Sequence, residues 1–318
     1  MSIFTQVPLA AQLLKQGLLV GIPTETVYGL GGNGLDASVV LEIFKAKGRP
    51  TFDPLILHVA SLAAARKWVK EISPVAFQLG QTFWPGPLTL LLPKKDIVPD
   101  IVTSGSEWVG VRVPAHPVTL SLLTLLDFPL AAPSANPFGY ISPTTAQHVM
   151  DQLGDKIAGV LEGGPSYVGI ESTVVKVLED KIEIYRPGAI TAEQLTNLTG
   201  LPCIRMEDTE HPTAPGMLTS HYAPRKPLFL KTSNDRLWQA GEFWIRFQYP
   251  VAGVPAQAQL ILASDGKLET AARNLFAVLR ELDANPEVKC IYAEGVPNTG
   301  LGVAINDKLK RASHQPES

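Results

Sequence analysis

Cysteine is scarce in this 318-residue sequence, which holds only Cys203 and Cys290, far apart and outside any CxxC pair. Two isolated cysteines exclude a structural zinc site and a disulfide-rich scaffold. Two reduced, buried thiols are expected in a cytosolic chain, with one long-range disulfide as the alternative.

Long hydrophobic runs are also missing. Residues 113–126 and 128–150 lack charged side chains, but prolines interrupt both, so neither predicts an unbroken membrane helix. The first residues, MSIFTQVPLAAQLLKQG, show no basic region and no clear signal cleavage site. We therefore expect a cytoplasmic protein that does not contact a membrane.

No part of the chain is a basic block. Lys and Arg number 27 against 30 Asp and Glu, and a slight acidic excess holds on both sides of residue 205. Composition thus does not indicate a nucleic-acid binder, although it leaves room for a local basic pocket. Hydrophobic residues at 45% and charged residues at 18% predict a sizeable core rather than disorder.

Residues 1–206 alternate between short apolar runs and helical patterns. Strands are expected at 18–22, 55–59, 88–92, 109–113, 129–133, 172–177 and 182–185, the last two as a hairpin. Helices are expected from near Thr5 to Gly17, after an Asp36 cap, and at 61–70, 74–83, 117–126, 144–153 and 191–199. This pattern predicts an α/β fold, with a twisted mixed sheet flanked by helices.

Residues 207–224 interrupt this rhythm with three prolines and a glycine, which is typical of an interdomain linker. A second, shorter α/β pattern fills residues 225–318. Its expected elements are strands at 227–230, 243–247, 259–263 and 288–293 and a helix at 266–283, as in a small Rossmann-like domain.

Two cations, Lys47 and Arg49, flank Gly48 where a helical pattern ends. Pro50 favours extended backbone at Arg49, so both cations can converge on one anion from a loop. Solvated cations that offset a helix dipole are the alternative interpretation.

Two further polar side chains stand in apolar strands. His58 lies at the C-terminal end of its strand, where open α/β sheets place ligands; a core histidine bonded to a backbone carbonyl is the alternative. Arg112 needs an opposite charge when buried, from either a nearby carboxylate or an anionic substrate.

Hydroxyl groups gather near glycines and prolines. Thr24 and Thr26 share one face of an extended segment, followed by glycines that allow a tight loop, although neither GxGxxG nor a Walker A motif is present. Prolines place Ser134 and Asn136 on one side, and Ser142 precedes a possible helix start that could hold phosphate. Ordinary structural turns are the alternative in both places.

The remaining polar positions lie at strand ends, with Ser172 and Thr173 at a strand start and Arg186 before Pro-Gly. Cations at element edges, rather than on solvated helix faces, match a triphosphate plus a carboxylate as ligand.

Taken together, the segments PTETVYGLG, KGRP, PLILHV, FWPGPLTLLL, VGVRVPAHP, APSANPFG and ESTVV resemble the YrdC-like family, in family order across about residues 10–200. The tail APGMLTSHYAP is similar to the longer branch, which appends a C-terminal domain. The resemblance implies an L-threonylcarbamoyladenylate synthase. Such an enzyme combines L-threonine, bicarbonate or CO₂, and ATP into threonylcarbamoyl-AMP and pyrophosphate, with Mg²⁺ on the nucleotide. Downstream threonylcarbamoyl-transfer proteins then modify tRNAs reading ANN codons.

The resemblance also implies site residues. Its Lys-x-Arg and Ser-x-Asn sets fall on catalytic Lys47, Arg49, Ser134 and Asn136. The threonine site would be Thr26, His58, Arg112, Ala132 and Ser172. The ATP site would be Lys47, Arg49, Asp53, Ser134, Ser142, Arg186 and Tyr222, with Tyr222 closing over the nucleotide. Asp53 departs from the asparagine common in the family, and no residue is assigned to a metal because no carboxylate cage is apparent.

Two other functions compete with this one. A carbamoyltransferase of hydrogenase maturation uses a related domain, but would carry zinc-binding CxxC motifs. An RNA-binding module with a vestigial pocket is weakened by the net negative charge; weak RNA contact as a secondary property is compatible with the sequence.

Overall fold

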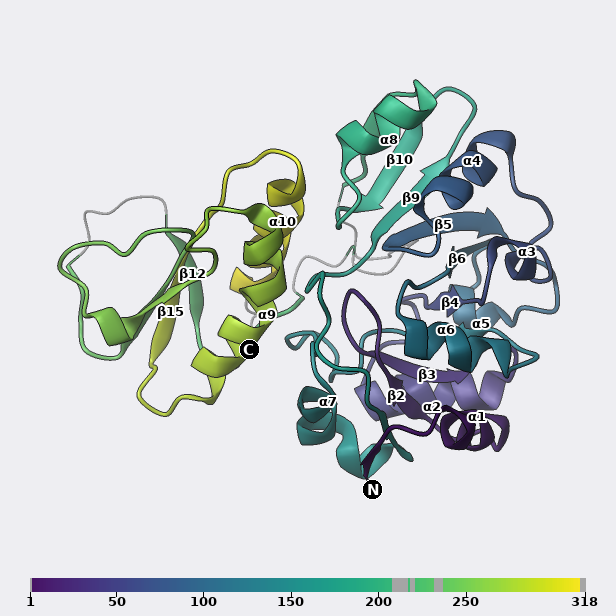
Figure 1. The fold of residues 1–318 in the computed structure, drawn as a ribbon, viewed down its shortest axis with the longest axis horizontal. Helices are drawn as coiled ribbons and strands as arrows, with labels where there is room; N and C mark the ends of the chain where they lie inside the picture. Colours follow the sequence, from purple (N-terminus) through teal and green to yellow (C-terminus); the bar gives the residue numbers. More distant parts are fainter. Residues whose placement is uncertain (1, 208–216, 218–220, 232–236, 315–318) are drawn as a thin grey trace.

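The computed structural model describes residues 2–207, 217, 221–231 and 237–314 (Figure 1). The chain forms a large unit around an 11-stranded sheet and a smaller unit around a 4-stranded sheet. Helices α9 (Leu268–Ala284) and α10 (Leu301–Ser313) lie on the side of the small unit that faces the large one (Figure 1). Within these residues, no helix has both the length and the apolar character that a membrane crossing requires.

The large sheet is mixed, as the sequence predicts. Its spatial order is β1-β8-β2-β3-β7-β4-β6-β5-β9-β10-β11, and the expected hairpin is the antiparallel pair β9–β10. The strands are β1 (Ile3–Phe4), β2 (Val20–Ile22), β3 (Gly29–Asn33), β4 (Ile56–His58), β5 (Leu88–Pro93), β6 (Trp108–Arg112), β7 (Leu130–Ala131), β8 (Gly159–Leu161), β9 (Thr173–Val177), β10 (Ile182–Arg186) and β11 (Cys203–Arg205).

Helices cover this sheet. They are α1 (Val7–Lys15), α2 (Ala37–Lys47), α3 (Leu62–Ala65), α4 (Pro74–Phe83), α5 (Asp100–Thr103), α6 (Pro117–Thr124), α7 (Ala146–Leu153) and α8 (Ala192–Thr199), with a 3₁₀ turn at Gly154–Lys156. Asp36 caps α2 as expected, because its carboxylate accepts from the Ser38 and Val39 amides. Helix α3 is shorter than the predicted 61–70, because Val69 instead forms a β-bridge with Lys94.

The glycine-rich segment corrects one expectation. Instead of a tight loop, Gly29–Asn33 forms β3, antiparallel to β2. The glycines serve packing, since a methyl group on Gly32 would lie 2.9 Å from Val39 Cγ1 in α2, and one on Gly34 would lie 2.6 Å from Leu57 Cδ2. Small residues therefore let α2 and the neighbouring strands approach β3 closely.

The small unit is a parallel sheet in the order β12-β15-β13-β14, consistent with the Rossmann-like expectation. Its strands are β12 (Leu228–Lys231), β13 (Glu242–Arg246), β14 (Gln259–Ile261) and β15 (Cys290–Glu294), with a 3₁₀ turn at Ala256–Ala258. Helix α9 was expected and α10 was not. The buried face of α10 carries Asp307, Lys308 and Arg311 between apolar residues, which hides the helical pattern.

The two units share a core and polar contacts. Val27, Ile141 and Ile170 of the large unit pack in one apolar cluster with Phe276 of α9. Arg280 of α9 donates to the Ser142 carbonyl at 3.3 Å and also to the Ile141 carbonyl. Buried contacts of both kinds fix the seating of α9 against the large unit.

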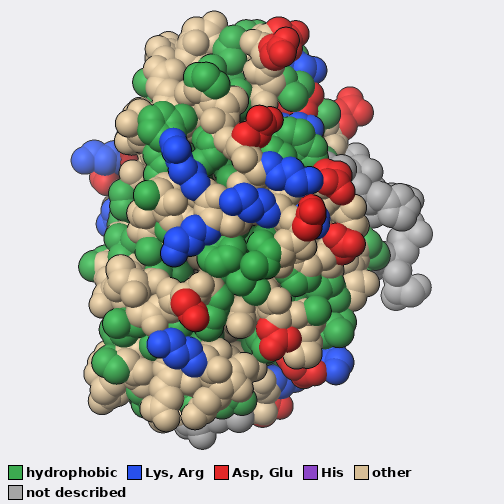
Figure 2. Space-filling model, turned by 90° about the vertical axis from the view of Figure 1, so that its right-hand side faces the viewer, with side chains coloured by type: hydrophobic (Ala, Val, Ile, Leu, Met, Phe, Trp, Pro, Cys, Tyr) green, Lys and Arg blue, Asp and Glu red, His purple; other side chains and the backbone are tan. Residues whose placement is uncertain are grey.

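Among the described residues, the face of the large unit that points away from the small unit has no continuous basic patch. Figure 2, which views the side away from the small unit, shows a group of Lys and Arg side chains bordered by Asp and Glu. Cys203 and Cys290 lie in different units as half-buried thiols, so burial of the thiols is less complete than expected.

Candidate active site

One cavity gathers most of the residues singled out in the sequence. Its lining includes nine of the site residues that the resemblance implies, from β4, β6, β10 and five loops: Thr26, Arg49, His58, Arg112, Ala132, Ser134, Ser172, Arg186 and Tyr222. Thr24, Glu171 and His221 also line it. Lys47, Asp53, Asn136 and Ser142 lie in a layer of buried side chains that does not line the cavity.

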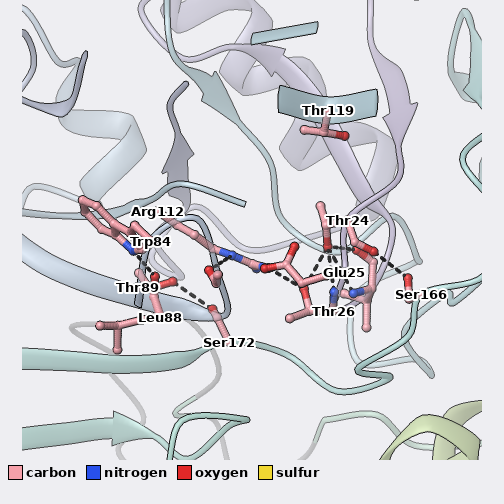
Figure 3. Close-up of polar contacts among 12 residues, drawn as sticks. Thr24, Glu25, Thr26, Trp84, Leu88, Thr89, Arg112, Thr119, Ser166 and Ser172 are labelled. Atoms are coloured by element: carbon pink, nitrogen blue, oxygen red, sulfur yellow. Dashed lines mark hydrogen bonds and ion pairs between the residues drawn. The ribbon is translucent and has the colours of Figure 1, made fainter. Parts of the chain in front are cut away.

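Arg112, at the end of β6, is held by groups from the segment after β2 (Figure 3). Its Nη2 lies 2.7 Å from Glu25 Oε1 and donates to Thr26 Oγ1 at 2.9 Å, while Nε donates to the Gly86 carbonyl at 3.3 Å. Of the two partners expected for Arg112, the nearby carboxylate is thus present in the fold. The guanidinium still reaches the cavity wall, where it could hold an anion.

Hydroxyl groups surround this guanidinium (Figure 3). Thr24 and Thr26 share a face as predicted, with their Oγ1 atoms 2.8 Å apart. Ser172 Oγ lies 2.8 Å from Thr89 Oγ1 of β5 and accepts from Arg186 Nη2 at 3.0 Å. This end of the cavity can therefore bind a small polar molecule with a carboxylate and a hydroxyl group.

His58 is opposite Arg112 in the parallel pair β4–β6. Burial, and then the charge of Arg112, lower the pKa of His58 to about 3, so the ring is neutral at pH 7. Its Nδ1 has no hydrogen-bond partner within the described residues. Nδ1 is thus open to a ligand, while a backbone hydrogen bond with Ile56 belongs to the core-histidine alternative, and ligand binding by His58 stays a prediction.

Arg49 also lines the cavity and is tied to its own loop. It lies 2.9 Å from Asp53 Oδ2 and donates to the Asp53 and Pro54 carbonyls at 3.0 and 2.8 Å. Burial raises the pKa of Asp53 against the opposing pull of Arg49. Asp53 therefore orients the Arg49 guanidinium in this structure, and its side chain does not reach the cavity.

Lys47 ends α2, and Gly48 follows with φ +63°, as the helix-stop pattern predicts. Lys47 Nζ donates to the Ser134 and Asn136 carbonyls at 2.6 and 2.5 Å. Lys47 and Arg49 thus do not converge on one point here. Lys47 instead braces the loop that presents Ser134, because its ammonium supplies the donors that these buried carbonyls need.

Asn136 and Ser142 stabilise the same loop region. Asn136 Nδ2 donates to the Tyr140 carbonyl at 2.7 Å, and Ser142 Oγ donates to Glu171 Oε1 at 2.5 Å. Ser142 does not stand at a helix start, because α7 begins at Ala146 with Thr145 as its cap. The expectation of open helix amides beside Ser142 is therefore wrong.

Tyr222 lies in the segment between β11 and β12 that joins the two units, and it lines the cavity wall. Its backbone has φ +65°, and its ring centroid lies 4.2 Å from that of His221 and 5.4 Å from that of Phe276 in α9. Arg186 lines the wall at the end of β10. The guanidinium groups of Arg49 and Arg186 and the ring of Tyr222 in the cavity wall suit a phosphorylated, ring-bearing ligand.

Sequence reasoning missed three residues of this site. Glu25 pairs with Arg112, Glu171 accepts from Ser142, and the His221 ring meets the Tyr222 ring edge to face. Glu25 and Glu171 each precede a hydroxyl residue that was selected, so their positions next to Thr26 and Ser172 were the available signal.

Two family models match the chain. The model described as Telomere recombination matches residues 12–188, and the model described as the threonylcarbamoyl-AMP synthase C-terminal domain matches residues 190–314. The threonylcarbamoyl-AMP synthase of Pyrococcus abyssi is 39% identical over 97% of this chain and 94% of its own length. The protein of that name from Bacillus subtilis is 39% identical over 97% of this chain and 93% of its own.

Solved structures agree with these relatives. The crystal structure of P. abyssi Sua5 complexed with L-threonine superposes with a TM-score of 0.89 at 36% identity, covering 98% of this chain and 97% of that one. E. coli YciO, at 22% identity and a TM-score of 0.52, covers 59% of this chain and shows the fold of that part alone. Both family models and the near full-length similarity thus confirm the YrdC-like resemblance, and the chain belongs to the threonylcarbamoyl-AMP synthase family in its two-domain form.

Proposed function

We infer that this chain is a threonylcarbamoyl-AMP synthase, which joins L-threonine, bicarbonate or CO₂, and ATP into threonylcarbamoyl-AMP and pyrophosphate. The observation that carries the inference is a single cavity whose wall holds two chemically different groups of side chains. Arg112 and hydroxyl groups form one group, called the first end, and Arg49, Arg186 and Tyr222 form the other, called the second end. The two groups meet where Arg186 donates to Ser172 Oγ at 3.0 Å. An amino acid and a nucleotide bound in these ends would meet between them.

At the first end, we propose that Arg112 binds the threonine carboxylate. Thr26, His58 and Ser172 would contact its other polar groups, and the backbone near Ala132 would supply a further contact. Support comes from the geometry of Arg112, whose guanidinium is fixed by Glu25 and Thr26 at 2.7 and 2.9 Å. A charge-assisted contact with a held guanidinium loses little conformational freedom when substrate binds.

At the second end, we propose that Arg49, Arg186 and Ser134 bind the triphosphate and that Tyr222 covers the nucleotide. Lys47 and Asn136 stay predicted catalytic residues, and their bonds to the loop carrying Ser134 support a positioning role. Ser142 and Asp53 act on this end through Glu171 and Arg49, which they contact directly.

The chemistry requires no protein nucleophile. The amine of threonine forms a carbamate with bicarbonate or CO₂, and the carbamate oxygen attacks the α-phosphate while pyrophosphate leaves. The side chains would hold two substrates in line and offset negative charge on the phosphates. Mg²⁺ bound to ATP would supply further positive charge, and the buried, unsatisfied Glu171 Oε2 at the cavity is a fitting oxygen donor for it.

The wider biological role remains part of this proposal. The product would pass to threonylcarbamoyl-transfer proteins that modify tRNAs reading ANN codons, in the cytoplasm. Residues 1–206, 207–224 and 225–318 stay the predicted catalytic domain, linker and C-terminal domain. Much of the linker lies outside the described residues.

An RNA-binding module is the competing function. The Lys and Arg side chains on the outer face of the large unit are bordered by acidic ones, which weakens a broad contact with a phosphate backbone (Figure 2). Weak RNA contact during product transfer remains compatible with that surface.

The test is pyrophosphate release from ATP by purified protein with Mg²⁺ and bicarbonate, with and without L-threonine. Release that depends on threonine, and is much weaker with serine, is the expected result. Folded protein that releases no pyrophosphate under any condition, yet binds RNA in a salt-dependent way, would favour the binding module.

A further inference from the structure

Glu171 presents a buried carboxylate oxygen to the cavity without a partner. The side chain lines the cavity, and the residue is only 5% exposed. Oε1 accepts from Ser142 Oγ at 2.5 Å, whereas Oε2 has no hydrogen-bond partner within the described part of the chain. A buried acceptor left unsatisfied is costly, so a ligand that occupies Oε2 would recover free energy.

Neighbouring cations do not satisfy this oxygen. Lys47 and Lys308 are close enough to feel the charge of Glu171, but their ammonium groups donate to carbonyls of Ser134, Asn136 and Pro187. Arg186 directs its donors to the Ser172 carbonyl and hydroxyl at 3.0 Å each. None of these groups donates to Oε2, which stays open toward the cavity.

A carboxylate at this place conflicts with a nucleotide bound directly beside it. Phosphate oxygens held by Arg49 and Arg186 would bring negative charge toward Oε2, and like charges repel strongly at a buried site. A divalent cation between the two reverses the sign of that interaction.

Mg²⁺ fits the donor set. It is commonly bound by one or two carboxylates together with substrate phosphates and waters, rather than by a cage of protein ligands. Within the described residues, no group of three or more His, Cys, Asp or Glu could hold a metal ion, so the remaining ligands would come from the nucleotide. A serine hydroxyl beside an acidic side chain is also the pairing that P-loop enzymes use around their Mg²⁺.

We propose that Glu171 Oε2 is the protein ligand for the Mg²⁺ that enters with ATP, and that Ser142 orients the carboxylate. This assignment rests on the proposed function and adds the residue through which the protein contacts the metal. Glu171 would then bind the metal only when nucleotide is present, because the protein alone offers one carboxylate.

The experiment measures metal binding rather than turnover. Mn²⁺, which replaces Mg²⁺ and is paramagnetic, is titrated into the full-length protein with a non-hydrolysable ATP analogue, and unbound Mn²⁺ is read by electron paramagnetic resonance. We compare wild type with Glu171→Gln, which keeps an oxygen for the Ser142 hydroxyl and removes only the charge. Glu179→Gln, at an exposed turn, is the matched control for the loss of one carboxylate.

Wild type and Glu179→Gln should bind Mn²⁺ with the analogue, and wild-type protein without nucleotide should not. Glu171→Gln should weaken Mn²⁺ binding by about tenfold or more, as loss of a metal-directed carboxylate typically does. Glu171→Asp keeps the charge on a shorter arm and should fall between the two. Calorimetry with L-threonine should give similar affinities throughout, which shows that the variants are folded.

Two results would overturn the assignment. Mn²⁺ affinity in Glu171→Gln equal to or tighter than in wild type would mean that the metal is not bound here. If Glu171→Gln lost the same fraction of its nucleotide affinity with and without metal, Oε2 would instead make a hydrogen bond with the nucleotide. Wild-type protein that binds no nucleotide would reject the proposed function itself, and the role of Glu171 with it.

Discussion

The ammonium group of Lys308, in the last helix of the small unit, lies 5.5 Å from the centroid of the Tyr222 ring in the cavity wall. Lys308 is fully buried and donates to the Pro187 carbonyl at 2.7 Å, directly after Arg186. Burial lowers its pKa to about 8, against the attraction of Asp307. One side chain of the small unit therefore touches both the ring and the strand end at the proposed nucleotide end.

Replacing this lysine should weaken ATP binding selectively. In Lys308→Met, Pro187 loses its donor and Tyr222 loses its cation, so we expect KM for ATP to rise about tenfold, equal to roughly 1.4 kcal/mol. KM for L-threonine should stay close to wild type. Lys310→Met, at an exposed position of the same helix, is the control. A similar rise for both substrates would indicate general damage to the fold instead.

Arg49 should contribute strongly to turnover. Arg49→Ala removes charge-assisted contacts with the phosphates, so we expect a loss of at least about 2 kcal/mol of transition-state stabilisation, or roughly 30-fold in kcat/KM. Steady-state pyrophosphate release measures this loss. Lys45 is an exposed cation in the last turn of α2, and Lys45→Ala should change kcat/KM little. Turnover near the wild-type rate in Arg49→Ala would show that Arg49 is not a catalytic residue.

The Arg112–Glu25 pair allows binding and stability to be separated. Arg112→Ala leaves Glu25 buried without its 2.7 Å partner, so we expect a loss of about 3–5 kcal/mol in the free energy of unfolding, along with threonine binding. Adding Glu25→Gln should restore much of the stability and none of the threonine affinity. Denaturant unfolding and calorimetry measure the two quantities. Recovery of threonine binding in the double variant would contradict the carboxylate-binding role.

His58 should lower the stability of the folded protein in acid. In the unfolded chain its pKa is near the ordinary 6.5, whereas in the folded chain it is about 3, so the unfolded state binds the extra proton between these values. The free energy of unfolding should therefore fall as pH drops below 6.5, by roughly 1 kcal/mol per unit from this residue. Unfolding at several pH values between 7 and 5 should show a shallower slope for His58→Asn. Equal slopes for both proteins would mean that His58 is protonated in the fold.

His58 and Arg112 could be predicted from the sequence because parallel strands finish at a common edge, and they are adjacent in register in the pair β4–β6. Ser172, just before β9, and Arg186, at the end of β10, meet because these two strands form an antiparallel hairpin. The sequence also placed the hairpin and the second sheet correctly, since apolar runs and turn residues define both.

The missed features depend on contacts between distant segments. Glu25 resembles any acidic side chain until the fold places Arg112 beside it. Helix α10 has a buried face with Asp307 and Lys308, whose charges are satisfied by the large unit rather than by water. A helix with buried charges shows no clean apolar stripe, so periodicity alone could not identify it.

Gly169 lies where the large unit packs against α9, and no larger side chain fits there. Its φ is +83°, its amide donates to the Thr26 carbonyl at 3.2 Å, and a methyl group there would lie 2.5 Å from the Ala272 carbonyl of α9. A single added carbon would therefore push α9 away from the segment with Thr26, which carries the proposed threonine end of the cavity. The α9 backbone and the proposed threonine end of the cavity are thus in contact through Gly169, so any larger residue at this position would displace one of the two.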